Sequence, residues 1–198
     1  MFYFEGHGIL HPGGKVIFAT SETHARVKSG LHLDEVPALF RGFRGKRVML
    51  LADCCHSGGL QAVGAALVKR GIDAVTLTSA TRSKISTASW TFTQALIDCL
   101  GRSALCDANS DNRITLNEVR GESAIAMLHR EQQQIGWADP RGLGGLVIAE
   151  TRHDAPAPAL EPGQPRRGEW VAVAHRGKPW AARLLGADGD TLRVCDRS

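Results

Sequence analysis

The chain has 198 residues, of which 43% are hydrophobic and 22% charged. This is the composition of a globular protein, so wholesale disorder is excluded. No apolar run approaches the roughly 18 residues that a membrane span needs, and the first residues lack the basic start of a signal peptide. We therefore expect a cytoplasmic protein that does not bind membranes.

The net charge of +4 is spread along the chain without a clustered basic patch, which argues against nucleic acid as a partner. The cysteine count is five, and no two cysteines have the C-x-x-C spacing. This odd number and spacing argue against both a disulfide framework and a structural zinc site.

Apolar runs with high strand propensity alternate with helical stretches over residues 1–150. The predicted strands are Phe2–Phe4, Val16–Ala19, Val48–Leu51, Ala74–Leu77 and Leu146–Ala149. The predicted helices are Leu31–Phe43, Leu60–Arg70, Thr91–Leu100 and Leu116–Gln133. The two central strands are apolar without alternation, as strands buried on both faces are. The pattern predicts an α/β domain whose mostly parallel sheet carries helices on both faces.

The composition changes after this domain. Residues 154–166 hold four of the eight prolines, so we predict an extended linker over residues 151–167. Residues 168–198 read as three short strands, the start of a small SH3- or Tudor-like barrel that is only partly present. Trp170 and Trp180 fit its core, and a surface for a cationic ligand is the alternative.

A cysteine and a histidine lie where reactive groups are expected. Cys55 follows the strand at 48–51 and precedes a glycine-rich turn into a helix, where the helix dipole lowers the pKa of a thiol. His7 lies between two glycines at the end of the first strand, 48 residues earlier. A histidine roughly 50 residues upstream of the cysteine is typical of caspases, so the separation indicates a cysteine peptidase.

The motifs around both residues resemble those of one family. The segment 3–8, Tyr-Phe-Glu-Gly-His-Gly, is similar to the histidine motif of caspase-like cysteine peptidases. The segment 53–58, Asp-Cys-Cys-His-Ser-Gly, resembles the D-x-C-H-S-G motif of their metacaspase branch. The segments 77–80 and 91–96 resemble the strand and the F-T-x-A-L helix that follow in that family. The likeness covers roughly residues 1–150, and the motifs occur in the family's order.

The resemblance implies a role for each matched residue. Cys55 would be the nucleophile and His7 the acid and base of a dyad. The backbone N–H groups of Gly8 and Cys55 would form the oxyanion hole. Asp53 would lie at the base of the S1 pocket, so the substrate would be a protein or peptide with Arg or Lys at the cleavage site. Glu5 departs from the family, which has a small residue there.

Three neighbours offer alternative assignments. Cys54 is an alternative nucleophile, although consecutive strand-end residues point to opposite faces. His56 is read as structural, because a residue rarely reaches the side chain of its neighbour in the chain. Ser57 lies in a string similar to a nucleophile elbow, but the preceding glycine and the partners are missing.

A second motif predicts calcium. Residues 107–118 fit the register of a twelve-residue EF-hand loop. The side chains of five residues would supply ligand oxygens: Asp107, Asn109, Asp111, Thr115 and Glu118. Arg113 would supply its main-chain carbonyl oxygen. Asn112 replaces the usual glycine and tolerates positive φ. The alternative is a turn that caps the following helix without metal. No cofactor is required for the peptidase chemistry itself.

Two functions follow from these patterns. The first is a cysteine endopeptidase cleaving after Arg or Lys. The second is an inactive caspase-like scaffold that binds calcium or a partner. The strand at residue 2 comes earlier in the chain than the family pattern expects, so we also expect a further N-terminal segment, or a partner, to cover the exposed sheet edge.

Overall fold

The computed structural model describes residues 1–23, 29–86, 89–151, 170–175, 178–188 and 191–195. The chain divides into two compact units, which are described separately. The first contains residues 1–95 and 120–145, and the second contains residues 96–119 and 146–198. The predicted linker falls almost entirely outside the described residues.

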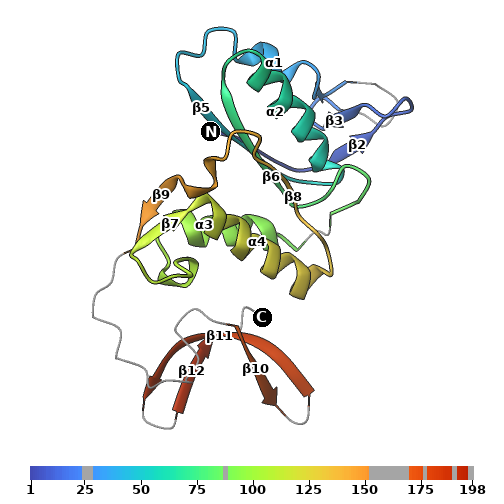
Figure 1. Ribbon diagram of the computed structural model, residues 1–198. Helices are drawn as coiled ribbons and strands as arrows, with labels where there is room; N and C mark the ends of the chain where they lie inside the picture. Colours follow the sequence, from blue (N-terminus) through green and yellow to red (C-terminus); the bar gives the residue numbers. More distant parts are fainter. Residues whose placement is uncertain (24–28, 87–88, 152–169, 176–177, 189–190, 196–198) are drawn as a thin grey trace. The chain divides into compact units, whose positions relative to one another are not determined.

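A four-stranded sheet organises the first unit (Figure 1). Its order is β1-β5-β6-β8, with parallel pairing of the first three strands and antiparallel pairing of the last. The strands are β1 (Phe2–Glu5), β5 (Arg47–Asp53), β6 (Asp73–Thr78) and β8 (Gly136–Ala138). The predicted α/β class with a mostly parallel sheet is therefore confirmed.

One face of this sheet packs in a core with α2 (Leu60–Lys69) and the start of α1 (Val36–Leu39). Alternate residues of β1 and β5 reach this core because side chains in a strand alternate between faces. They are Phe2, Phe4, Val48, Leu50 and Ala52. Phe4 stacks on Phe18 with ring centroids 4.2 Å apart.

The helix predicted over 31–43 is wrong for most of its length. Only α1 is helical, and Leu31–His32 form the short strand β4 instead. Pro37 in the first turn of α1 has no N–H group to donate, and Leu39 at its end is 64% exposed, so little packing extends the helix.

A second, antiparallel sheet contains the predicted strand at 16–19. Its order is β2-β3-β4, formed by Gly8–Leu10, Val16–Phe18 and Leu31–His32. This strand therefore exists but does not join the parallel sheet. Two short 3-10 helices, η1 (Ser57–Gly59) and η3 (Leu143–Gly145), complete the unit with parts of α3 (Thr91–Leu100) and α4 (Leu116–Glu131).

The second unit contains two small sheets. In one, β7 (Arg113–Thr115) pairs antiparallel with β9 (Val147–Glu150), so the strand predicted at 146–149 is not part of the parallel sheet. The helix η2 (Ala104–Cys106) precedes it.

The other sheet of this unit is antiparallel, with the order β10-β11-β12. Its strands are Trp170–His175, Lys178–Asp188 and Thr191–Cys195. These are the three strands predicted in the tail, and they form no closed barrel within the described residues. The environments of the Trp170 and Trp180 side chains lie outside what the structure describes. Across the described part of the chain, no helix is long and apolar enough to cross a membrane.

Candidate active site

The parallel pairing of β1 and β5 brings the two predicted catalytic motifs together. Glu5 pairs with Asp53 at the ends of the strands, and His7 and Cys55 each follow two residues later. All four line one cavity of about 410 Å³ at the carboxyl ends of the strands. Its remaining lining residues are Gly6, Cys54, Ser86 and Trp90. Such strand ends are where α/β proteins place their sites.

Gly8 permits a very close approach between the two motifs. A Cβ atom on Gly8 would lie 1.7 Å from the carbonyl oxygen of Cys55, so no other residue fits without moving the backbone. Ala19 N–H donates to the His7 carbonyl (2.8 Å), which places Gly8 at a non-hydrogen-bonded position of the β2–β3 pair. The Gly8 N–H therefore points away from β3 and is not used in the β2–β3 pairing.

The Cys55 sulfur is held by the segment after β6. Ser86 N–H donates to Cys55 Sγ at 3.3 Å, and the thiol lies 3.7 Å from the Ser86 carbonyl oxygen. Cys55 is partly exposed, so the sulfur is both accessible and positioned.

Cys54 has the opposite environment. It is 2% exposed and belongs to the apolar core on the α2 side of the sheet, as the alternation along the strand predicts. Burial, and to a lesser degree the neighbouring charges of Cys55 and Asp53, raise the pKa of the Cys54 thiol far above its ordinary value. A thiol that does not ionise is a poor nucleophile, so the geometry favours Cys55.

His56 and Ser57 fix the shape of the turn. His56 has φ of +58°, its Nδ1 lies 2.9 Å from the Arg82 carbonyl oxygen, and its N–H donates to the Lys84 carbonyl (2.8 Å). Ser57 is fully buried and its Oγ donates to the Ala80 carbonyl while accepting from the Ala80 N–H. Both side chains tie the turn to the segment after β6.

Asp53 is 9% exposed, and one of its oxygens is bonded to the start of α3. Its Oδ2 accepts the Thr93 hydroxyl at 2.6 Å and the Thr93 N–H at 3.2 Å. The N–H groups of a first helical turn have no partner within the helix, so a carboxylate is stabilised there. Tyr3 Oη lies 2.8 Å from Thr93 Oγ1 and extends this hydrogen-bonded chain to β1.

Sequence reasoning did not identify the contributions of Ser86, Trp90 and Thr93. Trp90 lines the cavity, is 57% exposed and has φ of +58°, a conformation that costs energy for a bulky residue. The signal for Thr93 was present, because it is the threonine of the F-T-x-A-L segment. Nothing in the sequence marks Ser86, which acts through its backbone.

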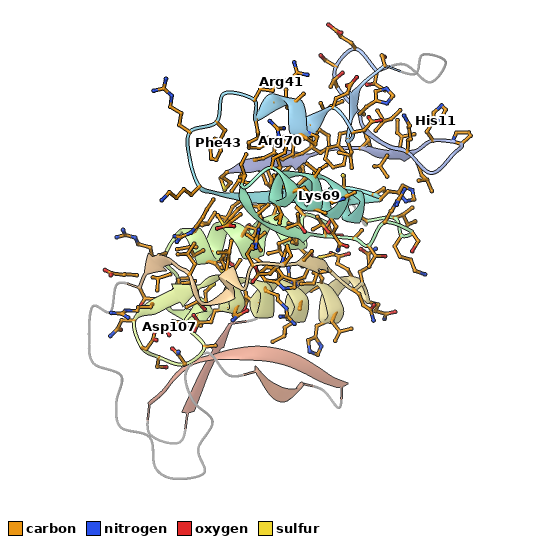
Figure 2. All side chains as sticks on the ribbon, turned by 45° about the horizontal axis from the view of Figure 1, so that its top comes forward. His11, Arg41, Phe43, Lys69, Arg70 and Asp107 are labelled. Atoms are coloured by element: carbon orange, nitrogen blue, oxygen red, sulfur yellow. The ribbon has the colours of Figure 1, made fainter. Side chains whose placement is uncertain are left out.

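In the predicted calcium loop, the carboxylates of Asp107 and Glu118 accept hydrogen bonds from the backbone of the loop itself. Asp107, labelled in Figure 2, is 1% exposed and accepts the N–H groups of Asp111 (3.1 Å) and Asn112 (2.8 Å). Glu118 accepts from the N–H groups of Ala108 and Thr115, at 2.9 and 2.8 Å. The Thr115–Glu118 pair is a capping box for α4.

The fit of this loop to calcium is partial. Its donor atoms are all oxygens, which Ca²⁺ prefers, and Asn112 has the positive φ (+67°) required at its position. Against this, each Glu118 oxygen already accepts a backbone N–H group, so only its remaining lone pairs are open to a cation. Among the described residues, no group of three or more His, Cys, Asp or Glu side chains is placed to hold a metal ion.

Comparison with known proteins does not extend the assignment. Neither the models of protein families nor the curated proteins gave a match to the chain. The resemblance to caspase-like peptidases thus depends on the motifs and on the site that they form.

Proposed function

We propose that the protein is a cysteine endopeptidase with a metacaspase-type Cys–His dyad that cleaves after Arg or Lys. The observation that carries the proposal is the shared cavity of His7, Cys55 and Asp53 at the ends of neighbouring parallel strands. The fold class supports it too, since the mostly parallel sheet positions both motifs as a caspase-like domain would.

The chemistry follows from the positions of these groups. The Cys55 thiolate attacks the scissile carbonyl and forms a C–S bond, while the charge on oxygen is stabilised by the Gly8 and Cys55 N–H groups. His7 then gives a proton to the leaving amine as the C–N bond breaks. Water, deprotonated by His7, hydrolyses the thioester and releases the Cys55 thiolate.

Asp53 supplies the specificity. A carboxylate buried at the base of the cavity attracts a cationic side chain and repels an acidic one, because its charge is poorly screened there. The hydrogen bonds from the Thr93 hydroxyl and N–H fix the orientation of this carboxylate.

The test is hydrolysis of fluorogenic peptides ending in Arg, Lys or Asp by the wild type, Cys55→Ala and Cys54→Ala. We expect cleavage after Arg and Lys, loss of at least about a thousandfold in Cys55→Ala, and near wild-type rates in Cys54→Ala. Cys54→Ala is the matched control, because it makes the same substitution one residue away in the core. Equal hydrolysis by wild type and Cys55→Ala, or cleavage only after Asp, would refute the proposal.

The second candidate is an inactive scaffold that binds a partner or calcium. It is favoured by the exposure of His7, whose ring makes no hydrogen bond to any described residue that would orient it for catalysis. A thiol-reactive peptide probe ending in Arg separates the two: labelling of Cys55 in folded protein supports the peptidase, and no labelling supports the scaffold.

The proposed location remains the cytoplasm. Cys54, Cys55, Cys99 and Cys106 are all free thiols. Free thiols are typical of a reducing compartment.

A further inference from the structure

Glu5 is the one residue of the histidine motif that departs from the family pattern, and its side chain lines the cavity beside Asp53. It ends β1 on the same face as Tyr3, opposite the core face of Phe2 and Phe4. Its register partner is Asp53, and paired residues of adjacent parallel strands lie side by side on one face of the sheet. Both side chains line the same cavity.

The two carboxylates differ in their freedom. Asp53 is buried and fixed by Thr93 through Oδ2, whereas Glu5 is exposed. Burial raises the pKa of the neighbouring Tyr3 hydroxyl, and the charges of Glu5 and Asp53 add to that increase. Both carboxylates therefore lie close enough to the same hydroxyl to affect it. One carboxylate of the cavity lining is therefore buried and fixed, and the other is exposed.

No Lys or Arg among the described residues neutralises this pair, and the basic side chain in the lining, His7, is the proton donor of the proposed reaction. The cavity lining contains neither Lys nor Arg, and the two ion pairs in the described part of the chain are Lys15–Asp34 and Arg141–Asp73. Two carboxylates facing one cavity repel each other until a cation enters. The missing charge is expected from a ligand.

We propose that Glu5 is a specificity-determining residue that, together with Asp53, selects arginine over lysine in the substrate. The proposal rests on the proposed function, since it takes the cavity to be the pocket for the residue before the cleaved bond. The planar guanidinium presents five N–H donors in a fixed fork and can bond two carboxylates at once. A lysine ammonium is a compact point charge at the end of a flexible stem, so it engages the two anions less well.

The experiment distinguishes a guanidinium that bonds both carboxylates from a general attraction between the negative charge of Glu5 and any cation. Binding of an acetylated Arg peptide and its Lys counterpart is measured on Cys55→Ala protein, with Glu5 wild type, Glu5→Gln or Glu5→Ser, by titration calorimetry. A change in intrinsic tryptophan fluorescence is a second readout, because Trp90, one of the four tryptophans, lines the same cavity. Glu22→Gln is the matched control, since it removes one exposed carboxylate outside the cavity.

We expect the wild-type pocket to bind the Arg peptide about tenfold more tightly than the Lys peptide, a free-energy difference of about 1.4 kcal/mol. In both Glu5 variants this ratio falls to about twofold or less, while Glu22→Gln preserves it. An unchanged Arg-to-Lys ratio in the Glu5 variants, or an equal loss of affinity for both peptides, would overturn the assignment.

Hydrolysis by the same set of Glu5 variants in the Cys55 background gives the catalytic counterpart, as the ratio of kcat/KM values for Arg and Lys substrates. If no substrate is cleaved by any protein, the proposed function fails, but the binding ratios still decide the role of Glu5. If substrates are cleaved and the ratio does not respond to Glu5, only this further inference fails.

Discussion

The cavity at the ends of β1 and β5 and the loop at 107–118 contain the two densest polar motifs of the chain, and they use their carboxylates in opposite ways. Asp53 has one oxygen held by Thr93 and lines open space of about 410 Å³. Asp107 and Glu118 each accept backbone N–H groups through both oxygens, and so satisfy the turn that contains them.

The difference shows what a sequence motif can and cannot say about a site. Both motifs have the right residue types at the right spacing. In the cavity, the strand register leaves the reactive groups facing open space. In the loop, the same kind of side chain replaces missing backbone partners, which stabilises the fold whether or not a ligand binds.

Apart from the loss of Cys55 itself, the largest expected effect comes from a side chain added at Gly8, where the two motifs of the cavity approach each other. Gly8→Ala would place a Cβ atom 1.7 Å from the Cys55 carbonyl oxygen, so the backbone must move. A displacement of about 1 Å in a catalytic group costs roughly a hundredfold in rate, and we expect at least that loss in kcat/KM. Gly42→Ala is the control, because nothing lies within 4 Å of its added Cβ. Equal activity of the two variants would show that the His7 and Cys55 segments need not touch.

The second effect is a difference in alkylation rate between the adjacent residues Cys54 and Cys55, which tests their difference in accessibility. Cys54 is 2% exposed and burial raises the pKa of its thiol, whereas the Cys55 thiol is partly exposed. We expect iodoacetamide to alkylate Cys55 at least about a hundredfold faster than Cys54, as measured by peptide mass spectrometry of folded protein. In denaturant the two rates should converge. Comparable rates in the folded protein would contradict the burial of Cys54.

The third effect concerns the loop. Asp107→Asn replaces one buried carboxylate oxygen with an amide that cannot accept a backbone N–H, and leaving such a donor unsatisfied costs about 1–3 kcal/mol. We expect that loss of unfolding free energy in denaturant titrations without calcium. Asp111→Asn, at an exposed position of the same loop, should cost less than about 1 kcal/mol.

Calcium added to the same proteins sharpens this test. If the predicted site binds the ion, calcium at a hundred times its Kd stabilises the wild type by about 2.7 kcal/mol, and Glu118→Gln removes most of that gain. If calcium does not change the melting temperature, the carboxylates of the loop serve only its backbone, and the predicted EF-hand is wrong.

Residue patterns predicted the parts of the fold that depend on local sequence. The buried runs at 48–51 and 74–77 predicted β5 and β6, and the helical spacing from Leu60 predicted α2 to within one residue. The strand at 16–19 was also found, but its sheet was not, because pairing partners are set by contacts distant in sequence. Strand β8 was missed, since three residues around Trp137 carry no periodic signal.

The candidate site was predictable to the same extent as the fold: its residues could be predicted, but most of their hydrogen-bond partners could not. His7, Cys55 and Asp53 follow strands in recognisable motifs, and alternation along β5 already separated Cys55 from Cys54. The hydrogen bonds of Ser86 and Thr93 were not predictable, because a backbone N–H or a helix start leaves no mark that specifies its partner. The backbone hydrogen bonds of the loop carboxylates were not predictable for the same reason. Sequence spacing identifies a hydrogen-bond acceptor but not the N–H group that donates to it.

The smallest expected effect tests how far the hydrogen-bonded chain behind Asp53 extends. The pKa of Tyr3 is raised from its ordinary 10.0, mainly by burial and then by the charges of Glu5 and Asp53, against the opposing hydrogen bond to Thr93. A raised pKa means that the unfolded state loses its proton first, so the contribution of Tyr3 to stability is complete below about pH 10 and declines as the pH rises through its folded pKa. Tyr3→Phe lacks this titration and loses one hydrogen bond, so we expect it to be less stable than the wild type at pH 7 by no more than about 1 kcal/mol. The gap should narrow above about pH 10 in urea titrations read at several pH values. A gap that is constant or widens with pH would show that the folded protein does not raise the pKa of Tyr3.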